Sequence, residues 1–182
     1  MEKKQSFTRK ERIMNEARKL FAEKGYEETS TKEIAKLAGV SEALIFRHFS
    51  NKDNLLTHLI KSGYRKVLFS NKGMMSYKDP RSFLLNMIQL PHKLVHEDPI
   101  FWKMQSRLSH HSFSKIQHDL FMKPVRPILE RAFKDLNYEN PVLEAELLLL
   151  VIDTLWKKEA SGELEQSVEI AKLLHNKYKL ID

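Results

Sequence analysis

The feature that most constrains this chain is a capped turn between two short helical segments in residues 29–49. Ser30 and Glu33 have the spacing of a capping box, in which each side chain satisfies the other residue's backbone amide. Gly39 follows the last turn of the first segment, where a left-handed backbone costs glycine little. Ser41 is of the residue type that caps the next helix. The pattern predicts a helix-turn-helix.

Helical periodicity separates the inner and outer faces of this motif. The inner positions are Ile34, Leu37, Ala38, Ile45 and Phe49. At about 100° per residue, Ala43 and Arg47 point the opposite way, with Leu44 and Phe46 at the margins. An exposed face centred on an arginine suits a helix that reads the DNA major groove. An ordinary helical hairpin is the alternative that the capped turn leaves open.

The residues around the turn extend the pattern in both directions. An amphipathic helix ends at Lys24-Gly25, and a further helix restarts within three residues of Phe49. Residues 8–56 as a whole resemble the TetR family of bacterial transcriptional regulators. The matching positions are Gly25, Tyr26, Thr29, Ser30, Ile34, Ala35, Ala38, Gly39, Val40, Ser41, Phe46, His48, Phe49, Lys52 and Leu55.

The resemblance implies which side chains meet DNA. Phosphate contacts are expected from Thr31, Ser41, His48 and Lys52, and the stretch that enters the groove holds Glu42, Ala43, Leu44, Phe46 and Arg47. Arg47 suits a guanine edge, and Leu44 or Ala43 suits a thymine methyl. Phe46 replaces the family's usual tyrosine, and Ala43 stands where glycine is common. Details of docking should therefore differ from those of the family.

Charge outside the motif is a weaker guide to DNA binding. The net charge is +7, but residues 61–131 carry 13 Lys and Arg against 5 Asp and Glu. A basic composition supports DNA binding only where it clusters on the docking face. The basic N-terminal residues Lys3, Lys4, Arg9, Lys10 and Arg12 are either a DNA-contacting tail or a solvated one.

Composition predicts an all-α protein. The chain has five glycines, six prolines and no segment with sustained strand-type alternation. It has no cysteine, which excludes disulfides and thiolate metal sites. No apolar run approaches the roughly 18–20 residues of a membrane span, and the N-terminus lacks a signal peptide's hydrophobic stretch. We expect a cytoplasmic protein without a membrane partner.

Two domains are expected. Residues 1–52 form a three-helix DNA-binding domain with the helix-turn-helix at about 29–48, and residues 53–182 form a helical effector-binding and dimerisation domain. The second domain should begin with a long helix over 53–73 that includes Leu68. A later helix should run over 114–136, disturbed by prolines, and Pro91 should kink another.

Proline-bent helices favour a ligand cavity, with irregular packing as the alternative. The candidate pocket residues are Phe69, Phe83, Met87, Trp102, Met104, Phe113, Phe121 and Trp156, although such side chains are also common in plain cores. The positive charge of residues 61–131 favours an amphipathic anion, such as a lipid-like acid, as the effector.

The last two helices suggest a dimer. Residues 147–152 are apolar all round, so one face meets the core and the other needs a partner. Two such helices from each subunit make a four-helix seam, which the resemblance also implies. The candidate interface residues are Leu147, Leu148, Val151, Val168, Ala171, Leu174 and Tyr178. A central core helix in a monomer is the alternative.

The sequence gives little support for catalysis. His92 and His96 are four residues apart, but a metal usually needs three or four convergent ligands, and no HExxH-type acid lies between a spaced pair. We therefore expect no enzyme activity, no metal and no cofactor. The predicted function is a ligand-responsive transcriptional regulator that binds a palindromic DNA operator as a homodimer, with repression favoured and a small-molecule effector releasing it. The alternatives are a helical protein-interaction module with the motif as scaffold, and an enzyme with a vestigial motif.

Overall fold

A computed structural model describes residues 7–180, and every regular element in that range is an α-helix, as expected. The helices are α1 (Arg9–Glu23), α2 (Thr31–Ala38), α3 (Glu42–Phe49), α4 (Lys52–Ser70), α5 (Pro80–Glu97), α6 (Pro99–Arg107), α7 (Ser112–Met122), α8 (Val125–Asp135), α9 (Pro141–Ser161) and α10 (Ser167–Lys177). None of these helices is long and apolar enough to cross a membrane.

The turn between α2 and α3 forms as predicted, with two exceptions. Gly39 ends α2 in the left-handed conformation (φ 63°, ψ 44°), and the Val40 amide donates to the Ala35 carbonyl at 3.0 Å. Ser41 has the backbone conformation of an N-cap, but its hydroxyl makes no capping hydrogen bond. Leu37, predicted to be inside, is 53% exposed because it lies beyond the buried edge formed by Ile34 and Ala38.

The capping box of α2 is only half formed. The Ser30 hydroxyl accepts a hydrogen bond from the Glu33 amide at 3.1 Å, but the Glu33 carboxylate pairs with Lys24. A reciprocal box is present instead at the start of α1, where Thr8 and Glu11 each accept from the other's backbone amide.

The second part of the chain departs from its predicted helices at one place. The single helix expected over 114–136 is two, because Pro124 lacks an amide hydrogen and separates α7 from α8. Pro127 is tolerated in the first turn of α8, where its amide would have no partner within the helix. Leu68 lies in α4, as predicted, and is 50% exposed. Helix α5 continues through Pro91 without interruption.

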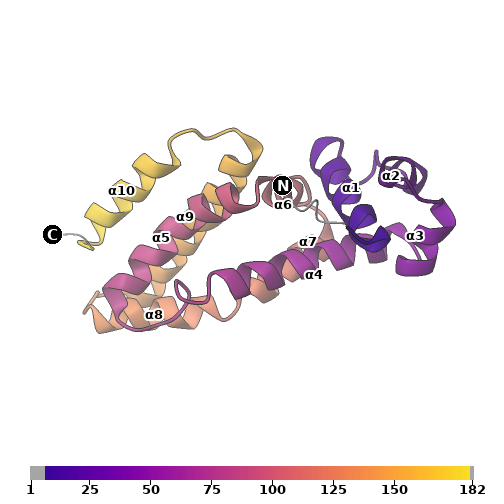
Figure 1. The fold of residues 1–182 in the computed structure, drawn as a ribbon. Coiled ribbons are helices and arrows are strands. Elements are labelled where there is room, and N and C mark those ends of the chain that lie inside the picture. The colour runs from indigo at the N-terminus through magenta and orange to yellow at the C-terminus, as the bar shows by residue number, and fades with distance from the viewer. Residues whose placement is uncertain (1–6, 181–182) are drawn as a thin grey trace, which may run out of the picture.

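The helices form an elongated molecule (Figure 1). Helices α1–α3 gather at one end, α4 leads away from them, and α8 and the C-terminal end of α10 lie toward the other end. Helix α9 packs against α5, α6 and α8, and α1 packs against α6. The DNA-motif end is therefore joined to the remainder by the α1–α6 contact as well as by the continuous helix α4.

Specific contacts fix that junction. The Asp98 carboxylate, between α5 and α6, accepts from Arg18 of α1 at 2.9 Å and from Lys66 of α4 at 3.1 Å. A Cβ added to Gly63 of α4 would overlap the ring of Phe101 in α6, so only glycine permits this approach. Three helices are thereby held together at one place.

Candidate nucleic-acid interface and effector cleft

The outer face of α3 is oriented as the periodicity predicted. Ile45 and Phe49 are 0% and 2% exposed, while Ala43 and Arg47 are exposed on the opposite side. Phe46 is 46% exposed and Leu44 is partly buried against the core. Helix α3 therefore presents a short outward surface with an exposed guanidinium, and its contact with bases stays a prediction.

The four predicted phosphate-contacting residues have unequal surroundings. Ser41 and His48 are exposed, and Thr31 donates a hydrogen bond to Glu42, tying the start of α2 to α3. The Lys52 ammonium donates to the carbonyls of Tyr26 at 2.9 Å and Thr29 at 3.1 Å. Two of its three hydrogens are thus used within the protein, and one remains for a phosphate.

Further basic side chains are exposed on α1 and α2. Lys32 and Lys36 of α2 are exposed, as are Arg9, Lys10 and Arg12 of α1. Lys10 lies over the Phe49 ring at 5.6 Å from its centre, which brings the start of α1 next to the end of α3. Lys3 and Lys4 lie outside the described residues. The sequence analysis did not single out Lys32 and Lys36, although their place on the first helix of the motif was a signal.

The predicted aromatic and methionine pocket does not exist as such. Four of its members, Phe83, Met87, Trp102 and Met104, are at most 3% exposed in the packed core, because their helical spacing turns them inward. Phe69 is 88% exposed, whereas Phe113 and Phe121 are partly buried against the core. Only Trp156 lines the large cleft described next.

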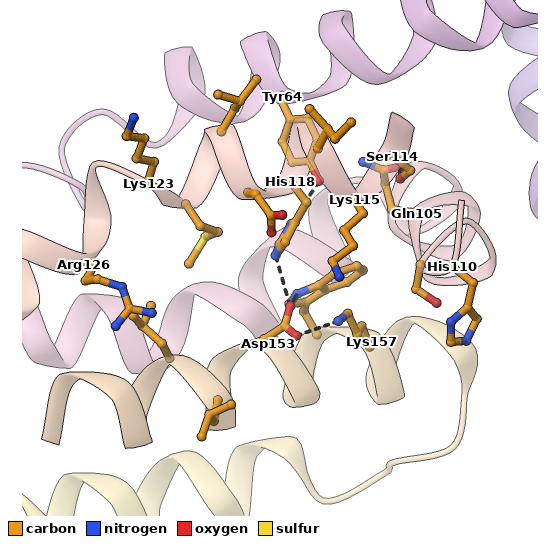
Figure 2. Close-up of a pocket in the computed structure, with 18 of the residues that line it drawn as sticks. Tyr64, Gln105, His110, Ser114, Lys115, His118, Lys123, Arg126, Asp153 and Lys157 are labelled. Carbon is orange, nitrogen blue, oxygen red and sulfur yellow. Dashed lines mark hydrogen bonds and ion pairs between the residues drawn. The ribbon is translucent and has the colours of Figure 1, made fainter. Parts of the chain in front are cut away.

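An open cleft of about 1040 Å³ lies between α4, the α6–α7 region, α8 and α9. Figure 2 shows its polar lining, including Tyr64 from α4, His118 from α7 and Asp153 from α9. Lys115 and Lys123 also line the cleft, and neither has an ion pair within residues 7–180. Arg126 pairs with Glu146 across the cleft wall. The sequence did not predict this polar lining, because the pocket candidates were all aromatic and methionine side chains.

A hydrogen-bonded chain connects three helices in the cleft. The Tyr64 hydroxyl lies 3.1 Å from Nδ1 of His118, whose Nε2 lies 3.0 Å from the Asp153 carboxylate. Lys157 pairs with the same carboxylate. Burial raises the pKa of Asp153, but the hydrogen bonds from His118 and Lys157 outweigh it and lower the pKa to about 2. Burial also raises the pKa of Tyr64, so this hydroxyl keeps its proton.

The predicted interface residues divide into two groups. Leu148, Ala171, Leu174 and Tyr178 are at most 8% exposed within the subunit. Leu147 and Val168 are 43% and 39% exposed, and Val151 is partly buried. The prediction did not include Leu143 of α9 and Leu173 of α10, each 67% exposed. On α10 the predicted stripe mostly faces the inside of the subunit. Hydrophobic spacing shows that a helix has an apolar face but does not say which neighbour covers that face.

Residues 13–59 match the family model described as bacterial regulatory proteins of the tetR family. Over 71 residues the chain is 45% identical to YvkB, an uncharacterised HTH-type transcriptional regulator of Bacillus subtilis, covering 37% of each chain. Over 102 residues it is 28% identical to the HTH-type transcriptional repressor AcnR of Corynebacterium diphtheriae, covering 51% of this chain and 53% of AcnR. The chain thus spans about a third to a half of these relatives' lengths.

Solved structures share the whole fold. One is the TetR-family regulator PfmR of Thermus thermophilus, with 21% identity, a TM-score of 0.71, and 95% of this chain and 96% of PfmR covered. Another is the regulator FadR of Bacillus subtilis in complex with stearoyl-CoA, with 19% identity, a TM-score of 0.71, and 90% of this chain and 96% of FadR covered.

Proposed function

We propose that this chain is a homodimeric DNA-binding transcriptional regulator of the TetR family, whose family model matches residues 13–59. Repression is favoured, since its relative AcnR is described as a repressor. Residues 1–52 are the DNA-binding domain, and residues 53–182 bind the effector and form the dimer. The site of action is the bacterial cytoplasm, where operator DNA lies, and the protein has no enzymatic role.

The observation that carries this proposal is the outward face of α3. Arg47 projects from a short helix anchored by two fully buried side chains, with small Ala43 one turn before it. A guanidinium in this position pairs with a guanine edge, while Leu44, Phe46 and Glu42 flank it in the groove. Thr31, Ser41, His48 and Lys52 hold the backbone phosphates and set the register.

The cleft is the proposed effector site. Its ammonium groups on Lys115 and Lys123, which have no ion pair among residues 7–180, suit the acidic end of an amphipathic anion. Trp156, Leu149 and Ile116 of the cleft lining provide apolar surface for the remainder of the ligand. The FadR complex with stearoyl-CoA supports an acyl thioester as the class to test first.

Tyr64 provides a route from the cleft to the DNA. It stands on α4, the helix whose first residue, Lys52, is a proposed phosphate ligand. An effector that competes for the Tyr64–His118–Asp153 chain shifts α4 relative to α7 and α9. In a dimer this changes the separation of the two α3 helices, and a state with the wrong separation binds a palindromic operator weakly.

The dimer is proposed to form through the exposed apolar faces of α9 and α10. Leu143 and Leu147 lie on α9, and Leu173 and Val168 lie on α10. Pairing these faces about a two-fold axis removes apolar area from water on both subunits. Leu148, Ala171, Leu174 and Tyr178, which the sequence placed at this seam, support it from within the subunit.

Selection of bound sequences from random duplex DNA tests the proposal. We expect a palindromic consensus whose half-sites are about one helical turn apart, and an affinity that falls steeply with salt. An interaction module that uses the motif only as scaffold would select no consensus.

The effector is tested on the selected operator. Palmitoyl- and stearoyl-CoA, with decanoic and palmitic acids, are titrated into the complex, and DNA affinity and melting temperature are measured. A ligand of this class should raise the melting temperature and weaken DNA binding, and Lys115→Ala with Lys123→Ala should abolish both effects. If neither value changes, the proposed ligand class is wrong, while the DNA-binding role stands.

A further inference from the structure

A second cluster of polar side chains lies outside the set of residues that line the cleft. His92 and His96 stand one turn apart on α5, and Glu159 reaches them from the last turn of α9. The Glu159 Oε1 atom is 2.6 Å from Nδ1 of His92 and 3.4 Å from Nδ1 of His96. One ligand atom from each residue lies within 4.8 Å of the other two. Three side chains of metal-ligand type, from two helices, are therefore gathered in one place.

Glu159 has an unusual environment for a carboxylate. Its side chain is only 7% exposed, yet its second oxygen, Oε2, is buried with no hydrogen-bond partner among the described residues. A buried carboxylate oxygen without a donor is costly, since it has lost water and gained nothing. The two histidines account for one oxygen of this carboxylate. The other faces the protein interior with an unused lone pair.

The contacts of the two histidines indicate which ring nitrogen of each carries hydrogen without an ion. Nδ1 of His92 donates to the Glu159 carboxylate, and this hydrogen has to leave if the same nitrogen is to bind an ion. Nδ1 of His96 lies 2.9 Å from the His92 carbonyl oxygen, so in a neutral ring this nitrogen carries the hydrogen. Nε2 of the same ring, rather than the Nδ1 measured against Glu159, is therefore the His96 atom with a lone pair for an ion. A metal-binding imidazole is commonly oriented in this way, by a hydrogen bond from its other ring nitrogen to a carbonyl oxygen. The Ser167 hydroxyl, at the start of α10, lies 3.3 Å from Nδ1 of His92 and supplies a further oxygen beside the cluster.

We propose that His92, His96 and Glu159 form a binding site for a divalent transition-metal ion of the zinc type. Imidazole nitrogen and carboxylate oxygen are ligands that zinc accepts, and three protein ligands leave one position for water or a small molecule. A tetrahedral ion with bonds near 2.0–2.1 Å keeps its ligand atoms roughly 3.3 Å apart. The His92–Glu159 pair, now hydrogen-bonded at 2.6 Å, has to open by about 0.7 Å to admit the ion.

The site clamps α5 to α9 just before the chain turns into α10. Both α9 and α10 carry the apolar faces proposed for the dimer, so an ion here fixes the segment on which that interface rests. Binding to the folded state alone raises stability by mass action. This site is separate from the effector cleft, and its existence does not depend on what the cleft binds.

Metal binding is measured on the full chain, without a histidine tag and after treatment with a chelator. Co²⁺ is titrated while its visible absorption is followed, and Zn²⁺ is then used to displace it. We expect one equivalent of Co²⁺ per chain, a visible spectrum typical of four-coordinate Co²⁺, and a melting temperature several degrees higher with Zn²⁺.

Three variants decide the assignment. His96→Gln changes a side chain that is 64% exposed, so the fold survives it, and Glu159→Gln keeps the size of the buried side chain. Each should weaken Co²⁺ binding at least tenfold and remove the Zn²⁺-dependent rise in melting temperature. His110→Gln, at an exposed histidine outside the cluster, should match the parent. No Co²⁺ uptake by the parent, or equal uptake by all variants, would overturn the proposal and leave a hydrogen-bonded cluster only.

Discussion

Arg47 and Lys52 are both basic and both proposed to contact DNA, but their surroundings differ. Arg47 is exposed on α3 and has no ion pair within the described residues, so its whole guanidinium fork faces outward. Lys52 is partly buried, lies 4.1 Å from the centre of the Tyr26 ring, and donates to two carbonyls. We expect a change at Arg47 to affect only the proposed contact with DNA. A change at Lys52 should also loosen the loop before α2.

Arg47→Ala should reduce discrimination at one base pair of each half-site by about 1–3 kcal/mol, because it removes the donor fork for a guanine edge. The salt dependence of binding should be little changed if this contact is to a base. The measurement is competition binding between the selected operator and single-base variants of it.

Arg65→Ala removes another exposed arginine, on α4, and is the matched control. It should leave the base preference intact. If both variants lower affinity for every sequence equally, Arg47 contacts phosphate and the assigned role is wrong.

Asp153→Asn tests the polar chain of the cleft through pH. The folded pKa of Asp153, about 2, lies below its unfolded value of roughly 4, so the charged carboxylate stabilises the fold above pH 5 or so. This contribution is lost as pH falls from about 4 toward 2. The parent should exceed the variant by roughly 1 kcal/mol at pH 7, a value reduced from the full linkage because the side chain is 37% exposed.

Urea unfolding of both proteins between pH 2 and pH 7 measures that difference. Asp119→Asn removes an exposed carboxylate from the same cleft and should have little effect at pH 7. A parent–variant difference that stays constant down to pH 2 would contradict the coupling of Asp153 to His118 and Lys157.

At the scale of elements, one face of α4 both packs into the core and reaches the cleft. Its inner residues Leu55, Leu56 and Ile60 join the core that includes α1 and α3, and Tyr64 continues the same face into the cleft. Gly63, beside Tyr64, lets the ring of Phe101 approach the helix backbone. The position of α4 is therefore set by α6 at the level of the cleft.

Gly63→Ala should lower the free energy of unfolding by about 1–3 kcal/mol, because the added methyl overlaps a ring that is 1% exposed and cannot move freely. Alanine is a better helix former than glycine, so a lower free energy of unfolding would come from the overlap with the Phe101 ring and not from helix propensity. Gly73→Ala, whose added carbon would meet nothing within 4 Å, is the control. Equal stability of both variants, measured by urea unfolding, would show that α6 shifts away at little cost.

At the scale of the whole molecule, several leucines of α9 and α10 are exposed on the surface of the subunit. Leu143 and Leu173 are each 67% exposed, and Leu147 is 43% exposed. Large exposed apolar side chains that gather into a patch normally mark an association site, and we propose that these leucines contribute to one. In the proposed dimer, the two α3 helices bind the two half-sites of an operator at once only if the subunits associate. Affinity for DNA and self-association should therefore be linked.

Leu147→Lys combined with Leu173→Lys should produce monomers and lower operator affinity at least tenfold, since each proposed seam then gains like charges and one half-site contact is lost. Light scattering after size exclusion gives the mass, and operator titration gives the affinity. Leu68→Lys, at an exposed leucine of α4, should stay dimeric. If the double variant remains dimeric, the dimer interface does not depend on Leu147 and Leu173.

The sequence alone determined the DNA motif, because its signals act between neighbours along the chain. The left-handed Gly39, the Ser30 cap and the Ile45–Phe49 spacing each operate within one helical turn, and the structure has all three. The break at Pro124 was less predictable, since a proline either bends or ends a helix according to what packs around it.

Only the tertiary structure decided the cleft and the histidine–carboxylate cluster. Tyr64, His118 and Asp153 come from three helices, and Glu159 is 67 residues from His92 along the chain. Helical periodicity tells which residues share a face but not which other helix covers that face. Core and cleft positions therefore look alike in the sequence, and long-range packing alone distinguishes them.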